Sequence, residues 1–395
     1  MNVSKVLIAG VGMTPFGKQL QRGLRNLAVA AIDEALADAG VPAADVDRVF
    51  FANAAAGIVT QQEMIRGQVA LRHHPLGGKP LINIENACAS GSSALNLAYE
   101  AISGGRAEVV VVVGAEQLNH PDRSRPFNAL RGSTDIEEIG ESEPGHQASN
   151  SILMDYYAGE AQGFLDRYGA SASDFALVAV KNRKHAAENP LAHLRSPQTV
   201  EDVLGARMIV SPLTLPMCSP TTDGAAALVV CSEEYGRRLS GTKLQVLACE
   251  VAPQGRGAAD RSPVTGATAA AYRAAGIGPA DLDLIELHDA AAPAELLQYA
   301  EIGICEEGQA HHLLRSGATA LGGKQPVNTS GGLLSRGHPL GATGCAQIVE
   351  LAMQLRGRAG NRQVAGARLA MAVNGGGWLG GMYALAVATV LQKLN

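Results

Sequence analysis

The sequence predicts an α/β fold made of two similar halves, with one segment inserted into the first half. Short apolar runs typical of strands alternate with alanine-rich stretches typical of helices along most of the chain. Residues 40–51 resemble residues 276–287, and each copy follows a helical pattern and ends in an apolar strand. Residues 120–219 are instead polar, charged and proline-containing. We therefore expect an N-terminal half at 1–119 and 220–242, a loop domain at 120–219 and a C-terminal half at 243–395.

The composition favours a large globular protein and argues against several classes of partner. Of the 395 residues, 47% are hydrophobic and only 17% are charged, so the chain can bury a large core. A net charge of −5 without a basic block argues against nucleic acid as a partner. The six cysteines lack C-x-x-C spacing, so neither a metal site nor a disulfide framework is expected. Without a signal-peptide pattern or a membrane-length apolar run, the sequence predicts a cytoplasmic protein that does not contact membranes.

In the first half, strand and helix patterns follow one another closely. Gly40 ends the first helical pattern and Pro42 follows it, as is usual at a helix C-terminus. Gly10 and Gly12 lie in a predicted loop, and they do not complete a dinucleotide-binding fingerprint because the third glycine is missing. We expect strands at 5–9, 46–52, 108–114 and 223–230, the loop at 10–17, and helices at 24–39 and 61–71.

The insertion and the second half continue this alternation. Two helices are expected in the insertion, and the second half should repeat the strands and helices of the first. Because sites in such sheets lie at the carboxyl ends of strands, polar side chains there are candidate site residues. The expected elements are helices at 152–168 and 173–188, a strand at 243–251, a loop at 252–266, a glycine-rich turn at 337–344 with a helix to 355, and a strand at 367–373.

Cys88 lies on a predicted tight turn between an apolar run at 80–84 and a helix at 94–102. The residues around it are small, namely alanine, serine and glycine, so a substrate carbonyl could approach the sulfur. The partial positive charge at a helix start favours thiolate over thiol. A buried structural cysteine is the alternative interpretation of the turn alone.

Two histidines far downstream strengthen the functional interpretation. His288 follows an apolar strand, and His338 lies in a turn dense in glycine. A cysteine with two histidines is the nucleophile-and-base set of covalent acyl chemistry, although a lone histidine is more often a structural residue. Asn374 and Gly376 belong to a run after the last core strand, where free N–H groups could form an oxyanion hole or the run could simply bend the chain. All four of Cys88, His288, His338 and Asn374 are predicted at strand ends, which points to one active site.

At these residues the chain resembles the thiolase superfamily along nearly its whole length. The resemblance implies a five-layered αβαβα fold with a projecting loop domain. It also implies that Cys88 forms an acyl-enzyme and that His338 activates Cys88. His288, in the sequence H-D-A at 288–290, resembles the histidine of sterol-carrier-protein type thiolases. In those proteins the residue at this position helps to hold the thioester oxygen. Ser219 matches a position that contacts the pantetheine arm, so coenzyme A is expected as a substrate, with no bound cofactor. The shared motifs are NACASG at 86–91, DGAAA at 223–227, ELHDA at 286–290, NTSGG at 328–332 and GHPLGATG at 337–344.

One departure from the family pattern concerns the carbon acid/base. Most thiolases carry a second cysteine in a C-x-G motif near the C-terminus, but here that position is Asn374. Sterol-carrier-type relatives can supply the cysteine after the H-D pair, but here that position is Ala290. An asparagine amide cannot accept a proton from carbon at neutral pH, so a histidine would have to serve.

These observations predict a coenzyme A-dependent acyltransferase that cleaves or forms a C–C bond, most naturally by thiolysis of a 3-oxoacyl-CoA. The acyl group could be branched, aromatic or dicarboxylic. Arg123, Arg125 and Arg131 could hold a carboxylate or a phosphate, or simply belong to a solvated loop. Two alternatives remain open: a condensing or C-acylating enzyme that uses Cys-His-His without a second cysteine, and a non-catalytic acyl-CoA binding subunit.

The expected partners are acyl-CoA, coenzyme A and other protein chains. The resemblance and the many small apolar residues predict a homodimer or a dimer of dimers. Thiolases without the second cysteine often pair with a small zinc-ribbon/OB-fold subunit, so such a partner is expected here as well.

Overall fold

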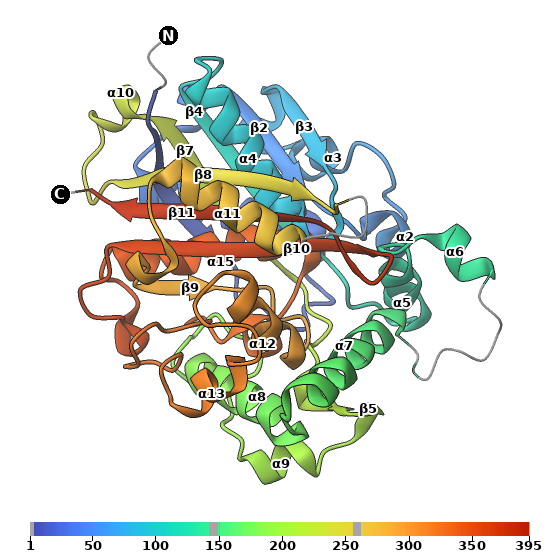
Figure 1. The fold of residues 1–395 in the computed structure, drawn as a ribbon. Helices are drawn as coiled ribbons and strands as arrows, with labels where there is room; N and C mark the ends of the chain where they lie inside the picture. Colours follow the sequence, from blue (N-terminus) through green and yellow to red (C-terminus); the bar gives the residue numbers. More distant parts are fainter. Residues whose placement is uncertain (1–3, 142–148, 150, 256–261, 395) are drawn as a thin grey trace.

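The computed structural model describes residues 4–141, 149, 151–255 and 262–394. Within these residues the main sheet has nine strands in the order β3-β2-β4-β7-β1-β8-β11-β10-β9 (Figure 1). A three-residue pairing of β1 with β8 joins the two parts of this sheet. The first part is β3-β2-β4-β7-β1 and the second part is β8-β11-β10-β9. The strands are β1 Val6–Met13, β2 Arg48–Ala52, β3 Leu81–Ile84, β4 Val109–Glu116, β7 Gly224–Ser232, β8 Leu244–Pro253, β9 Leu284–Glu286, β10 Leu369–Leu379 and β11 Met382–Lys393.

The buried side chains divide the molecule into five layers. Along β4, Val109, Val111 and Val113 pack into the cluster that contains α1 and α3, because side chains alternate between the two faces of a strand. Val110 and Val112 pack instead into the cluster that contains α4 and α15. Helices α11 and α12 belong to a third cluster, on the outer face of the second part of the sheet. The helices are α1 Gly23–Ala39, α3 Arg66–Leu71, α4 Ser90–Ser103, α11 Pro263–Ala275, α12 Ala292–Glu301 and α15 Leu340–Leu355.

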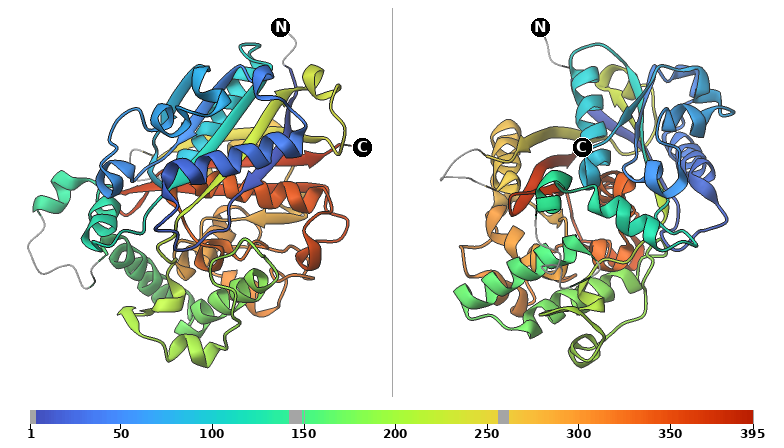
Figure 2. Two further views of the ribbon diagram at one scale, coloured as in Figure 1. Left: turned by 180° about the vertical axis from the view of Figure 1, so that it is seen from behind. Right: turned by 90° about the vertical axis from the view of Figure 1, so that its right-hand side faces the viewer.

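This arrangement confirms the predicted αβαβα order. Helix α11 faces the viewer in Figure 1, whereas α1 is in front in the back view of Figure 2. The central layer, α4 and α15, is buried between the two parts of the sheet. Gly114 of β4 and Gly341 of α15 show how closely these layers pack, since a Cβ on Gly114 would overlap the Gly341 carbonyl oxygen. No described helix has both the length and the apolar character that crossing a membrane requires.

The segment inserted between β4 and β7 is mainly helical. Its two long helices, α7 and α8, contact α12 of the second half (Figure 1). The buried ion pair between Lys181 Nζ of α8 and Glu295 Oε1 of α12, at 2.9 Å, fixes this contact. The segment contains α5 Ser124–Arg131, α6 Ile136–Glu141, α7 Ile152–Tyr168, α8 Ala172–Ala187, α9 Val200–Leu204 and the hairpin β5 Met208–Val210 with β6 Leu213–Thr214. The remaining short helices are α2 Ala56–Thr60, α10 Glu233–Gly236, α13 Ala310–Arg315 and α14 Gly332–Arg336.

Several predicted element boundaries are wrong, and each error has a local cause. The first half of the predicted loop at 10–17 is strand, because Gly10 and Gly12 let β1 approach the α1 backbone. The predicted helix at 61–71 begins only at Arg66, since Gln61 and Ile65 have positive φ angles of 67° and 49°. Helix α4 begins at Ser90 rather than at residue 94.

The glycine run after Asn374 continues β10 instead of ending it. Asn374 and Gly376 both pair with β11, opposite Val387 and Leu385. Gly377, with a φ of 62°, and Ala384 opposite it are left out of the pairing, and the register is the same on both sides of them. Asn374 is therefore inside a strand, and His338 lies between α14 and α15, so the prediction that both follow strand ends is wrong.

Candidate active site

Cys88 lies in a short turn between β3 and α4, as the sequence predicts. Its neighbour Ala87 has a positive φ of 48°. Ser90 stabilises the turn, because its hydroxyl donates to the Ala87 carbonyl at 2.6 Å and accepts the Asn86 N–H at 2.9 Å. Cys88 is 8% exposed and lines a cavity of about 580 Å³. The turn therefore presents the sulfur to a space large enough for a substrate.

His338 contacts Cys88 directly, from the turn before α15. Its Nε2 lies 3.3 Å from the Cys88 Sγ, and its Nδ1 lies 2.7 Å from Thr343 Oγ1. The Thr343 hydroxyl donates its proton to the Pro339 carbonyl at 3.0 Å, so its oxygen accepts the Nδ1–H of His338. This leaves Nε2 unprotonated and directed at the thiol. His338 is thus oriented to take the proton of Cys88.

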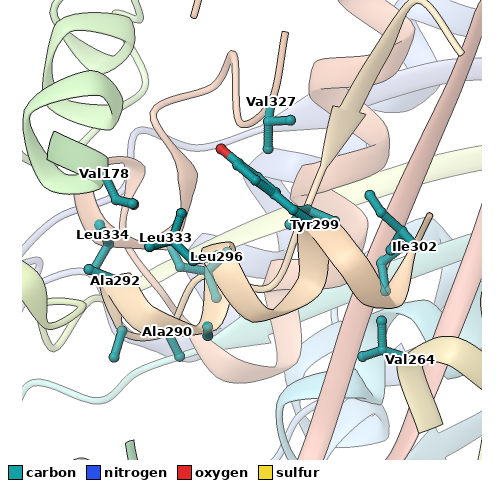
Figure 3. Packing of buried hydrophobic residues seen from close by; sticks show 14 of the residues in the cluster. Val178, Val264, Ala290, Ala292, Leu296, Tyr299, Ile302, Val327, Leu333 and Leu334 are labelled. Carbon is teal, nitrogen blue, oxygen red and sulfur yellow. The ribbon is translucent and has the colours of Figure 1, made fainter. Parts of the chain in front are cut away.

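His288 completes the cluster from the loop after β9. Gln298 of α12 bonds both its backbone N–H, at 3.1 Å, and its carbonyl, at 2.8 Å. The His288 ring meets the His338 ring edge-on, with 5.1 Å between their centroids. Figure 3 shows how α12 is anchored in the core: Leu296, Tyr299 and Ile302 pack among side chains of α8, α11 and α14. The loop that carries His288 is therefore held by a buried helix.

The reactive atoms of Cys88, His288 and His338 lie within 4.8 Å of one another. In residue type the set also matches the ligands of a three-ligand zinc site. Two observations favour a thiol with its base over a zinc site. They are the hydrogen bond between Cys88 and His338 and the tautomer that Thr343 imposes on His338. The expected absence of a bound metal stays a prediction.

Burial keeps this cluster neutral in the resting protein. It raises the pKa of the Cys88 thiol to about 12, with a smaller contribution from the Glu116 carboxylate. Burial also lowers the pKa of His288 to about 3 and that of His338 well below its ordinary value. The expectation that the helix start would favour thiolate is wrong here, because the desolvation of a buried thiolate outweighs it. A thiolate on Cys88 would need a proton acceptor, and His338 Nε2 lies within hydrogen-bond distance of the sulfur.

A pH profile tests this conclusion. Because the pKa of His338 is lowered from 6.5, its imidazole stays unprotonated as the pH falls through 6.5. We expect the rate constant for acylation of Cys88 to stay nearly constant from about pH 8 to about pH 6, whereas a base of ordinary pKa would lose about three-quarters of its active form. Rapid quenching followed by intact-mass analysis measures it. A rate that halves near pH 6.5 would contradict the lowered pKa.

Two more predicted positions line the cavity, and two do not. Ser219 and Ala290 line it, and the Ser219 N–H donates to the Ala290 carbonyl at 3.0 Å. Asn374, predicted to contribute to the oxyanion hole, lies behind His288 and bonds its ring. Gly376 packs against the Cys88 turn, where a Cβ would overlap the Asn86 carbonyl oxygen. Neither Asn374 nor Gly376 is among the described residues that line the cavity.

The arginines singled out in the sequence do not reach the cavity. Arg123 and Arg131 are exposed, and Arg125 donates to the Val59 carbonyl at 3.2 Å. Among the described lining residues the one arginine is Arg207, directly before β5. The polarity of the inserted segment signalled that it carries charge, but the fold decides which arginine faces the cavity.

Sequence reasoning also missed an aromatic wall in the cavity. Trp378 lies against Tyr157 and Tyr383, with ring centroids 5.2 and 5.4 Å apart. The two tyrosine hydroxyls share a hydrogen bond of 3.1 Å. Cys218, which also lines the cavity, directs its thiol to the Thr214 carbonyl at 3.6 Å. A signal was available, since the only tryptophan of the chain directly follows the glycine run.

Comparison with known proteins covers nearly the whole chain. The family model for the thiolase N-terminal domain matches residues 6–202, and the model described as thiolase C-terminal domain-like matches residues 254–393. The benzoylsuccinyl-CoA thiolase subunit BbsB of Thauera aromatica is 37% identical, covering 94% of this chain and 95% of that protein. The acetyl-CoA acetyltransferase of Methanothermobacter thermautotrophicus is 36% identical, covering 94% and 96%. Sterol carrier protein 2 of Homo sapiens is 36% identical, covering 99% and 72%.

Solved structures show the same fold. The Ltp2-ChsH2(DUF35) aldolase matches with a TM-score of 0.80 and 27% identity, over 100% of this chain and 99% of that chain. The human mitochondrial 3-ketoacyl-CoA thiolase in complex with CoA matches with a TM-score of 0.73, over 100% of this chain and 99% of that chain. At 18% identity the second match supports the fold alone. The chain belongs to the thiolase family, and it is an acyltransferase of that family.

Proposed function

We propose that the protein cleaves 3-oxoacyl-CoA by thiolysis, through an acyl-enzyme on Cys88. The observation that carries this proposal is the hydrogen bond from Cys88 to a His338 held in its basic tautomer, at the edge of a cavity that His288 also lines. A nucleophile within reach of an oriented base is the arrangement that covalent acyl transfer needs.

The reaction follows from this geometry. His338 Nε2 takes the thiol proton while the Cys88 sulfur attacks the 3-oxo carbon, and His288 donates a hydrogen bond to the developing oxyanion. The bond between C2 and C3 then breaks, and the leaving enolate, which is the C1–C2 fragment still bound to coenzyme A, is protonated by water, whose hydroxide takes the proton from His338. Coenzyme A next gives its thiol proton to His338 and attacks the thioester carbon. Its sulfur replaces that of Cys88, which recovers the proton.

The cavity mouth suits the pantetheine and phosphates of coenzyme A. Ser219 and Arg207 line the cavity, and Arg207 is exposed, so its guanidinium can meet a phosphate at the surface. Met208 and Leu215 add an apolar wall beside them. We propose that coenzyme A enters along these residues of the hairpin region.

The aromatic wall of the cavity suits an aromatic or bulky acyl group. Tyr157, Trp378 and Tyr383 form an edge-to-face cluster there, and such rings favour another aromatic ring over a flexible chain. Replacing the family's cysteine by the smaller Ala290 leaves additional room beside them. The BbsB relative, a benzoylsuccinyl-CoA thiolase subunit, agrees with an aromatic substrate.

Acyl transfer to the protein tests this function directly. Incubation with an aromatic 3-oxoacyl-CoA should add the acyl mass to the chain, and coenzyme A should then release it as a new acyl-CoA. Intact-mass and peptide analysis locate the group on Cys88. Binding of acyl-CoA without acylation would instead support a non-catalytic subunit.

We also propose a homodimer that forms through β3. This strand is at the edge of the sheet, and Ile82 on it is 53% exposed; Met64 and Ile65, just before α3, are exposed as well. An exposed edge strand with apolar side chains is a template for pairing, and a second copy can continue the sheet across a two-fold axis.

A charge on β3 should weaken this dimer. In Ile82→Glu each copy loses a buried isoleucine, roughly 1.5–3 kcal/mol, and two like charges meet at the axis. We expect the dimer dissociation constant to rise by about 100-fold or more in analytical ultracentrifugation. Ile136→Glu, which changes an exposed isoleucine on α6, is the matched control. Unchanged sedimentation of Ile82→Glu would remove β3 from the interface.

A second protein subunit is part of the proposal as well. The Ltp2-ChsH2(DUF35) aldolase pairs a protein of this fold with ChsH2. On this chain Phe127 and Met208 line the cavity and are 43% and 53% exposed. We propose that a partner of the ChsH2 kind covers these side chains beside the coenzyme A entrance.

A decarboxylating condensation is the second candidate function. Two observations favour it: the Cys-His-His set, and the lack of a second cysteine at Asn374 and Ala290. Loss of carbon dioxide from a malonyl thioester would form the carbanion without a carbon base. Release of carbon dioxide from malonyl-CoA by the acylated enzyme separates this function from thiolysis.

A further inference from the structure

We infer that Asn374 and Ser92 are positioning residues that hold His288 as a hydrogen-bond donor toward the cavity. This inference rests on the proposed function, in which His288 donates to the oxyanion. Most thiolases have their second cysteine at the position of Asn374. This chain therefore has an amide there in place of an acid/base side chain.

The amide of Asn374 connects the two side chains. Its Nδ2 lies 2.9 Å from His288 Nδ1, and its Oδ1 lies 2.8 Å from the Ser92 hydroxyl. All three side chains are at most 4% exposed, so bulk water does not compete for these bonds. The amide therefore has one partner on each side.

The Ser92 hydroxyl decides which way the amide faces. Its proton can go to Asn374 Oδ1 at 2.8 Å or to the Ala89 carbonyl at 3.3 Å, and the shorter bond is the stronger one. With the hydroxyl donating to Oδ1, the amide NH₂ faces His288 Nδ1. A neutral imidazole that accepts at Nδ1 carries its hydrogen on Nε2.

The two histidines of the site are thereby held in opposite tautomers. Thr343 accepts from Nδ1 of His338 and leaves Nε2 as a base, whereas Asn374 donates to Nδ1 of His288 and leaves Nε2 as a donor. Their rings are only 5.1 Å apart, so the cavity has one acceptor for the thiol proton beside one donor for the oxyanion. The low pKa of His288, which burial depresses to about 3, keeps this donor neutral.

Asn374→Asp tests the tautomer without changing the size of the side chain. A carboxylate can only accept, so it takes the hydrogen at Nδ1 and leaves Nε2 of His288 with a lone pair toward the oxyanion. We expect the acylation rate constant of Cys88 to fall by about 10²- to 10³-fold, as for loss of one oxyanion donor. Ser92→Ala should cause a smaller fall, and Asn96→Asp, an amide-to-acid change on α4 away from His288, should leave the rate unchanged.

Imidazole ¹⁵N NMR reads the tautomer directly in the resting protein. Wild type should show His288 protonated at Nε2, and Asn374→Asp should show protonation at Nδ1. A wild-type Nδ1 tautomer would overturn the inference, as would wild-type acylation rates in Asn374→Asp. If Asn374→Asp does not fold, the acylation rate of Asn374→Ala and the NMR spectrum of the wild type still test the inference. Failure of wild type to form any acyl-enzyme would reject the proposed function, while the NMR result would still stand by itself.

Discussion

Replacing Cys88 by alanine should abolish acyl transfer and leave the fold intact. The sulfur is the atom that forms the bond to the acyl group, and His338 has no other thiol within hydrogen-bond distance among the described residues. Loss of a nucleophile removes the covalent route, so we expect thiolysis to fall by on the order of 10⁴-fold or more. The change removes one small side-chain atom in a turn that Ser90 continues to hold. Thermal unfolding checks the fold, and coenzyme A-dependent substrate consumption measures the activity.

Cys218→Ala provides the matched control for this prediction. Cys218 lines the same cavity and burial raises its pKa to about 12, as it does for Cys88. Its thiol bonds the Thr214 carbonyl and has no histidine partner among the described residues. Acyl transfer should therefore survive in Cys218→Ala. An acyl group found on Cys218, Cys249 or Cys345 of the wild-type protein would contradict the assignment of Cys88.

The protein should cleave 3-oxoacyl-CoA without catalysing proton exchange at the α-carbon of acetyl-CoA. Exchange needs a base beside that carbon, and a positioned base contributes about 10²- to 10⁴-fold. Asn374 is an amide and lies behind His288, and Ala290 carries no ionisable group. We expect deuterium uptake into acetyl-CoA to be at least about 100-fold slower than thiolysis of a 3-oxoacyl-CoA. Mass spectrometry in D₂O measures both reactions.

Ala290→Cys should restore the missing exchange, because it puts a thiol on a residue that lines the cavity. Ala290→Ser is the control, since it adds a side-chain atom of similar placement that cannot act as the base. Rapid deuterium uptake by the wild-type protein would contradict the prediction and would identify another residue as the carbon base. Equal uptake by the cysteine and serine variants would show that Ala290 is not placed near the α-carbon.

The layered fold could be predicted because its signals are local. The unbroken valine run of β4 required two apolar faces, and the structure supplies both, with α1 on one side and α4 and α15 on the other. Gly40 and Gly276 were visible stop signals, and both adopt the left-handed conformation that ends α1 and α11. The errors arose where glycine serves close packing rather than a turn, as at Gly10 and Gly12.

The candidate site was only partly accessible from the sequence. The motifs brought together Cys88, His288 and His338, which the structure places within 4.8 Å of one another. They could not show that Arg207 rather than Arg123, Arg125 or Arg131 faces the cavity, because that depends on how the inserted segment folds over its mouth. The aromatic wall was hidden for the same reason, since Tyr157 and Tyr383 are 226 positions apart and meet only in the folded protein.

By itself the sequence determined the residue types, their neighbours in the chain, and therefore the layers and the family. The tertiary structure alone decided the charge and proton state of the site. Burial raises the pKa of Cys88 although a helix start lies beside it, because a buried thiolate loses its hydration by water. Thr343, five residues from His338, and Asn374, 86 residues from His288, give the two rings opposite tautomers. A tautomer depends on which partner lies within 3 Å, and only folding places that partner.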